Sequence, residues 1–254
     1  MTIHVFLAPS KLLRENIDFS LKVEGSKLPL MKNSMKLVEE LKEHDVNFWV
    51  NKLAVKKDVA ERSQLWLNEI SEKQLLKRGI PAALMFQGEA FKYLNAESFS
   101  TADWKWAQNH LSILSGMYGI ARATDLILPY RLMIGSSIPT LHHGNLYQFW
   151  KDHIANYINR ELKEKLLINC ASEEYSKVLD RKKIEATIID VSFLQKKDSE
   201  YKNVATLSKQ ARGALAGFAI RNKLKTVEEL TKFKDSGYSF AKKMSTDNKL
   251  VFIR

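Results

Sequence analysis

The chain has 254 residues, of which 45% are hydrophobic, and it carries a formal net charge of +11 and one cysteine, Cys170. A chain of this length can bury a sizeable core, and no apolar run approaches the ~20 residues that a membrane-spanning helix needs. The single cysteine excludes an intramolecular disulfide and a multi-cysteine metal cluster. Because the N-terminus also lacks a secretory signal, we expect a cytoplasmic protein with no membrane partner.

Hydrophobic periodicity predicts a mixture of strands and helices along the chain. Capping patterns support three of the helix starts, at Ser71, Ser100 and Thr226, and Asn145 supports a fourth. We find no linker, repeat or low-complexity segment, so we predict a single domain, 1–254, of the α/β (mixed α+β) class, with helices flanking a mixed sheet. The expected strands cover 3–8, 81–86, 166–171, 184–193, 201–207 and 250–253, and the longer helices cover 31–44, 58–70, 146–165 and 208–223.

The stretch 111–135 combines residue types that a plain core segment does not ordinarily carry. Gly116 and Gly119 are followed by Arg122 and Asp125 and then by Tyr130 and Arg131. We expect the helix that starts after Ser100 to reach Gly116, so that the two glycines form the turn of a helix-hairpin-helix-like element. Such a turn offers backbone N–H groups to DNA phosphates. Spacing alone favours the alternative, a plain joint between two helices.

Positive charge gathers toward the C-terminus, where residues 196–254 hold 14 Lys and Arg against 6 Asp and Glu. Such a field attracts nucleic acid, nucleotides or an anionic surface, although a solvated lysine-rich surface is an equal alternative. Lys209 and Arg212 lie at i and i+3 near the start of a predicted helix, where cations oppose the helix dipole. We therefore expect them to face an anion, with an ordinary salt bridge as the alternative.

Other polar residues follow the ends of predicted strands, a common place for functional groups. Ser10 and Lys11 follow the first strand, and Glu174 and Tyr175 follow the strand that ends near residue 171. We place them, with the basic residues above, around one positively charged cleft. The adjacent His142 and His143 have no ligand-like partners in sequence, and the apolar run around Cys170 indicates a buried inert thiol. We predict no metal site and no cofactor.

These residues also carry a resemblance to the YaaA family of bacterial peroxide-stress proteins. The stretch from Leu114 to Leu132 resembles the family pattern Leu-Ser-Gly-x-Tyr-Gly, Arg, Asp and Pro-Tyr-Arg-Leu. Further blocks that match in order are 8–11, 86–89, 146–150, 169–175, 209–213 and 237–240. Three departures stand out: Ala8 and Ser10 are exchanged relative to the Ser-Pro-Ala-Lys order of the family, Glu89 replaces an aspartate, and Met133 replaces a glutamate.

The resemblance implies an unusual α/β architecture and a role in peroxide stress, with limitation of free iron and binding of duplex or distorted DNA through a basic cleft. We hold three hypotheses open. The first is a DNA-binding stress protein. The second is an enzyme that acts on a nucleotide or nucleobase, with Lys11, Asp125 or Glu174 transferring protons, although no catalytic motif supports it. The third, direct iron binding, is the weakest, because the histidines show no ligand spacing.

Overall fold

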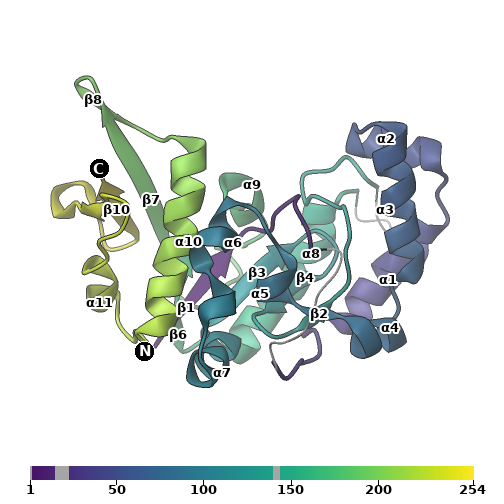
Figure 1. Cartoon of the computed structure of the whole chain (residues 1–254), viewed down its shortest axis with the longest axis horizontal. Helices are drawn as coiled ribbons and strands as arrows, with labels where there is room; N and C mark the ends of the chain where they lie inside the picture. Colours follow the sequence, from purple (N-terminus) through teal and green to yellow (C-terminus); the bar gives the residue numbers. More distant parts are fainter. Residues whose placement is uncertain (1, 15–22, 140–143) are drawn as a thin grey trace.

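The computed structural model describes residues 2–14, 23–139 and 144–254. Within these residues, eight strands form one sheet in the order β4-β3-β1-β6-β7-β10-β9, with β8 paired to β7 (Figure 1). The strands from β3 to β10 along this order are parallel, whereas β4 and β9 are antiparallel to their neighbours. The strands of this sheet are β1 (Thr2–Leu7), β3 (Leu111–Ser115), β4 (Gly119–Arg122), β6 (Lys165–Asn169), β7 (Ile188–Lys197), β8 (Glu200–Lys202), β9 (Ser239–Phe240) and β10 (Lys249–Ile253).

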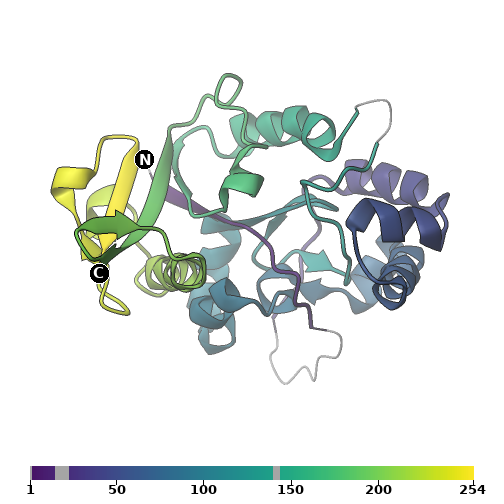
Figure 2. The same ribbon diagram turned by 90° about the horizontal axis from the view of Figure 1, so that it is seen from above.

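Helices cover both faces of the sheet. Figure 2 shows α10 on one face and α8 on the other, with β1 between them, and the first four helices form a group beyond the β4 edge. The predicted mixed sheet flanked by helices in a single domain is therefore confirmed. The helices are α1 (Met31–Lys42), α2 (Val46–Leu53), α3 (Lys57–Glu69), α4 (Glu72–Arg78), α5 (Ala82–Met85), α6 (Glu89–Leu94), α7 (Thr101–His110), α8 (Leu146–Glu161), α9 (Glu173–Ser176), α10 (Ala205–Arg221) and α11 (Val227–Thr231).

Local capping signals in the sequence mark helix starts correctly. Ser100 and Thr226 each begin a helix with a full capping box, in which the side chain at the third helical position bonds back to the cap. Asn145 accepts a hydrogen bond from the Gln148 N–H at the start of α8. These motifs act over three residues, so they do not depend on the rest of the fold.

The predicted helix-hairpin-helix-like element is wrong, because this stretch is a β-hairpin. Helix α7 ends at His110, and β3 and β4 pair antiparallel, with Ser115 opposite Gly119. The chain turns at Gly119, whose φ of 67° lies in the left-handed region that favours glycine. The apolar run before Gly116 is fully buried as a strand, a setting whose hydrophobic pattern cannot be told from that of a buried helix.

Two further expectations need correction. The strand expected over 81–86 is limited to β2 (Ile80–Pro81), which pairs with β5 (Leu126–Ile127), and the helical turn α5 follows it. Alanine, leucine and methionine in α5 are strong helix formers. Helix α2, which the periodicity did not reveal, begins at Val46 and is capped by Asp45, whose carboxylate accepts the Phe48 N–H. No helix in the described part of the chain is long and apolar enough to cross a membrane.

Candidate anion-binding site at the carboxyl edge of the sheet

A step in the sheet edge creates the main candidate site. Strand β6 ends at Asn169, which is opposite Asp190, while β7 continues to Lys197. The chain that leaves β6 therefore turns away beside a strand that is still extended. A pocket of about 740 Å³ lies in this step. Ligands of open α/β sheets bind outside the carboxyl ends of the strands, so the position is a typical one for a binding site.

The floor of the pocket is a row of polar residues across three parallel strands. Asp190 pairs with Asn169 on β6 and with Lys249 on β10. The Asn169 amide donates to Asp190 Oδ1 at 2.8 Å, and Arg181 Nη2 donates to the same oxygen at 2.7 Å. Asp190 and Ser192 lie two residues apart on β7 and so share one face. The alternation of polar and apolar residues in β7 thus directs a carboxylate and a hydroxyl toward the pocket.

Arg212 enters the pocket from α10. Within the described part of the chain no carboxylate forms an ion pair with it, and its Nε is buried without a hydrogen-bond acceptor. Burial lowers the pKa of Arg212, because desolvation disfavours the charged guanidinium, and only the nearby Cys170 opposes this effect. A desolvated arginine without a carboxylate partner is unusual. An anionic ligand would supply the missing charge and acceptor.

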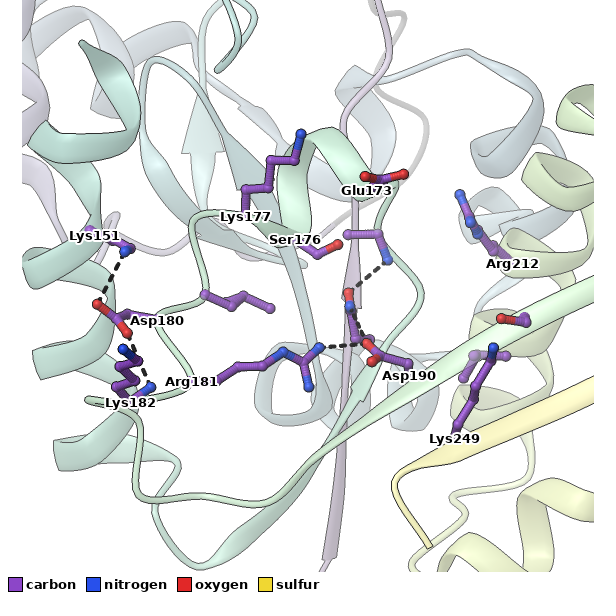
Figure 3. A pocket seen from close by; sticks show the side chains of 15 residues that line it. Lys151, Glu173, Ser176, Lys177, Asp180, Arg181, Lys182, Asp190, Arg212 and Lys249 are labelled. Atoms are coloured by element: carbon purple, nitrogen blue, oxygen red, sulfur yellow. Dashed lines mark hydrogen bonds and ion pairs between the residues drawn. The ribbon is translucent and has the colours of Figure 1, made fainter. Parts of the chain in front are cut away.

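Cations outnumber carboxylates around this pocket. Figure 3 shows Arg212 and Lys249 on one side, Asp190 with Arg181 at the floor, and Lys151 with Asp180 on the other side. Lys151 and Arg181 are ion-paired with Asp180 and Asp190, at 3.3 and 2.7 Å. The cationic lining residues are Lys151, Lys177, Arg181, Lys182, Arg212 and Lys249, and the acidic ones are Glu173, Asp180 and Asp190. The excess positive charge favours an anion.

Lys11 and Arg131, both predicted site residues, line a second and smaller pocket of about 310 Å³, together with Trp66 of α3. Lys11 follows the carboxyl end of β1. Strand β1 lies between β3 and β6 in the sheet, so the chain continues on one side of β1 and returns later on the other. The pocket is lined by three cations, Lys11, Arg62 and Arg131, and by one carboxylate, Asp58. An excess of positive charge beside an aromatic side chain suits phosphate and base contacts.

Three other predicted site residues, Ser10, Glu89 and Lys209, interact with groups close to them. Ser10 Oγ accepts the Leu12 N–H at 3.0 Å, and a Cβ added to Gly88 would lie 2.2 Å from that oxygen. Glu89 accepts hydrogen bonds from Gln210 at 2.7 Å and from Lys92, and these bonds lower its pKa. Lys209 is exposed on α10, close enough to Glu89 to contribute to that shift.

Helix α10 begins at Ala205, three residues earlier than the sequence indicated, so the strand expected over 201–207 is limited to β8 and ends at Lys202. Lys209 and Arg212 therefore lie in the second and third turns, beyond the range over which the helix dipole acts strongly. The dipole argument for an anion at these two residues no longer holds. The case for Arg212 depends instead on its burial and its missing partner.

Arg122 and Asp125 do not line either pocket. Asp125 is fully buried, and Arg122 donates to it from Nε and Nη2 while also donating to the Lys27 carbonyl oxygen at 2.9 Å. Ser26 and Gln108 donate to the same carboxylate at 2.7 and 3.2 Å. This is a satisfied network that holds the 23–27 segment against the sheet.

The two glycines of the hairpin are buried and cannot offer their backbone to a phosphate. A Cβ at Gly116 would lie 2.3 Å from the Leu132 carbonyl oxygen, and one at Gly119 would lie 2.6 Å from the Trp150 ring. Their role is close packing. This result corrects the expectation that they contact DNA.

The predicted tyrosines also belong to the core. The Tyr130 hydroxyl accepts a 2.7 Å bond from Ser115, and Tyr175 lies beside Met133, with 3.6 Å between the hydroxyl and the sulfur. Glu174, in contrast, is exposed and accepts the Gly135 N–H at 3.3 Å. Met133 therefore fills, with an apolar side chain, the position where the family pattern has a glutamate.

Sequence reasoning missed most of the pocket around Arg212. Arg181 lies in an irregular segment without a motif, and Lys249 reaches the floor only because β10 pairs with β7. The cluster at 172–175 was noticed, but Glu173, not Glu174, lines the pocket. The polar residues Asp190 and Ser192 inside an apolar strand were the one signal that could have indicated a polar face.

Cys170 is buried, as expected, and burial raises the pKa of its thiol to about 12. His142 and His143 lie outside the described residues. No group of three or more His, Cys, Asp or Glu side chains within residues 2–14, 23–139 and 144–254 could hold a metal ion.

These features define a mixed α/β protein with a cation-lined pocket at the carboxyl edge of its sheet. The chain belongs to the YaaA peroxide-stress family, because the family model described as peroxide stress protein YaaA matches residues 3–244. Similar proteins include a UPF0246 protein of Legionella pneumophila, 35% identical over 98% of both chains. Another, from Bordetella petrii, is 36% identical over 98% of both, and one from a Marinomonas species is 34% identical over 98% of this chain and 95% of its own.

Proposed function

We propose that this chain acts in the cytoplasm as a peroxide-stress protein that binds DNA, duplex or distorted, through the cationic surface at the carboxyl edge of its sheet. Family membership supports the stress-related part of the proposal. By covering DNA, the protein would help to limit the damage that peroxide causes together with free iron.

The observation that carries the DNA part is the state of Arg212. Arg212 is partly buried, its Nε has no hydrogen-bond acceptor, and no carboxylate among the described residues is ion-paired with it, while the exposed Lys249 lines the same pocket. Arginine binds phosphate through two parallel N–H bonds, which are stronger than bonds between neutral groups. Lys11 and Arg131 provide a second pair of cations at the end of β1. Phosphate contacts of this kind give affinity without sequence preference.

One observation favours a second candidate, an enzyme that acts on a nucleotide or nucleobase. The pocket volume of about 740 Å³ is within the range of small-molecule sites. The side chains of Asn169 and Asp190 on its floor could bind the polar edge of a base. This candidate predicts affinity for single nucleotides that does not increase with DNA length.

The test measures fluorescence anisotropy of a labelled duplex of about 20 base pairs at low salt, with the unmodified chain and three variants. We expect Arg212→Gln and Lys249→Gln each to weaken binding by about tenfold, the size of one lost charge-assisted bond. Lys73→Gln is the matched control, because Lys73 is exposed on α4 and lines neither pocket. Absence of DNA binding in the unmodified chain, or equal loss in all three variants, would contradict the proposal.

A further inference from the structure

We propose that the pocket around Arg212 binds a phosphate monoester, the terminal phosphate of a nucleotide or of a DNA strand. The inference rests on the DNA-binding proposal and deepens it. It proposes that the same cations contact the phosphate at the end of a strand and not the phosphodiesters along the strand. The two sources share one chemistry, a phosphate group attached to a sugar through a single ester bond.

The charges on one side of the pocket match a dianion. Arg212 and Lys249 both lack a carboxylate partner among the described residues, whereas Arg181 is already paired with Asp190. Figure 3 shows these two cations on the same side of the pocket, where both can face one ligand. A phosphate monoester carries about −1.5 to −2 at neutral pH, whereas an internal phosphodiester carries a single charge. The monoester thus balances both cations.

The three carboxylates restrict where more negative charge can lie. Glu173, Asp180 and Asp190 line the same pocket, and Figure 3 shows them spaced around it. A continuous nucleic-acid backbone would bring its neighbouring phosphates close to these carboxylates, where like charges repel. A ligand with one terminal phosphate avoids this cost, because only its sugar and base approach the acidic side.

Those same acidic groups suit the rest of a nucleotide. Glu173 is exposed and forms no ion pair within the described residues, so its oxygens are free to accept hydrogen bonds from sugar hydroxyls. Acidic residues play this part in nucleotide-binding α/β proteins. The Ser176 and Ser192 hydroxyls add neutral donors to the lining. Cations on one side of the pocket can bind a phosphate, and acceptors on the other side can bind sugar hydroxyls, so the lining suits a sugar phosphate.

The experiment compares a single-stranded oligonucleotide of about 10 residues carrying a 5′-phosphate, a 3′-phosphate or hydroxyls at both ends, by competition against a labelled strand. Deoxyadenosine monophosphate and deoxyadenosine form the small-molecule arm. We expect a terminal phosphate to increase affinity about tenfold, the size of a charge-assisted bond. The increase should disappear in Arg212→Gln and in Lys249→Gln and persist in Lys73→Gln. Lys249 is exposed, so its variant remains informative if the partly buried Arg212 cannot be replaced without unfolding.

Competition by the free nucleotide identifies a small-molecule ligand, and competition by phosphorylated strands alone identifies a DNA end; both support the inference. Equal affinity of phosphorylated and hydroxyl-ended strands, with no binding of the nucleotide above that of the nucleoside, would overturn it while leaving DNA binding intact. No binding of any strand, together with no binding of the labelled duplex, overturns the proposed function instead, and the nucleotide arm then decides the inference on its own.

Discussion

Arg122 and Asp125 form an ion pair at the edge of the core: the Arg122 backbone N–H donates to Asp125 Oδ2 at 2.7 Å, and Arg122 Nη2 donates to Asp125 Oδ1 at 2.9 Å. The carboxylate is fully buried and accepts two further bonds from Ser26 and Gln108. Sequence placed this pair in the binding cleft, but its contacts are those of a structural joint.

Replacing Asp125 should therefore reduce stability and spare binding. We expect Asp125→Ala to lower the free energy of unfolding by about 3 kcal/mol or more, because it leaves the Arg122 guanidinium without its buried partner. Urea denaturation measures the loss, and anisotropy measures DNA affinity below the unfolding range. A variant of normal stability that no longer binds DNA would show that Asp125 belongs to the binding surface after all.

Cys170 should be inert toward peroxide and alkylating agents in the folded protein. It is 1% exposed, and burial raises the pKa of its thiol to about 12, although Arg212 acts in the opposite direction. The reactive thiolate is thus almost absent at neutral pH. We expect iodoacetamide to modify Cys170 only in denaturant, as measured by intact mass. Rapid oxidation of the native thiol by hydrogen peroxide would instead indicate a redox sensor.

His4 should make the protein sensitive to acid. Burial and, to a smaller extent, Lys165 lower the pKa of His4 to about 3, and the neutral ring bonds to Ser112 Oγ at 2.9 Å. The unfolded state, with a pKa of about 6.5, binds the proton more readily. Stability is therefore complete above about pH 6.5 and falls as the pH decreases toward 3, by up to about 1.4 kcal/mol per pH unit.

Urea denaturation of the unmodified chain and of His4→Gln between about pH 7 and pH 5 tests this dependence. The variant should show a shallower decrease, with a remainder from His110, whose pKa is also lowered by burial. Identical slopes in the two proteins would rule out His4 as the cause.

Close packing of α6 on α10 depends on Gly213. A Cβ at this position would lie 1.8 Å from the Ala90 carbonyl oxygen, which belongs to the backbone and cannot rotate away. We expect Gly213→Ala to lower the free energy of unfolding by about 2 kcal/mol, and Gly213→Ser to lower it further, as overpacking does. Thermal unfolding measures both. Unchanged stability would mean that α6 and α10 can move apart enough to accommodate the added side chain without loss of free energy.

Local signals in the sequence were sufficient for much of the fold. The capping residues Ser100, Asn145 and Thr226 each begin a helix as predicted, because a cap involves only the next three residues. The hairpin after His110 was misread, since a short apolar run fits a buried strand and a buried helix equally. The pairing of β3 with β1 makes this run a strand and not a helix, and it joins residues about 100 positions apart in the sequence.

The candidate site could be predicted only in part, for the same reason. Arg212 was identified from its helical spacing, but its lack of an ion-paired carboxylate among the described residues is a property of the folded chain. Asp190 and Lys249 meet through the pairing of β7 with β10, which no local pattern encodes. Lys11 and Arg131 share a pocket, yet Arg122, equally basic in sequence, is tied to Asp125.

The salt dependence of DNA affinity tests the central claim most directly. Each phosphate contact contributes about −0.9 to the slope of log affinity against log salt concentration. We predict a steep negative slope for the unmodified chain and a slope shallower by about 1 to 2 for the Arg212→Gln, Lys249→Gln double variant. Affinity that does not change with salt, or a double variant with the slope of the unmodified chain, would contradict a phosphate-binding role for this pocket.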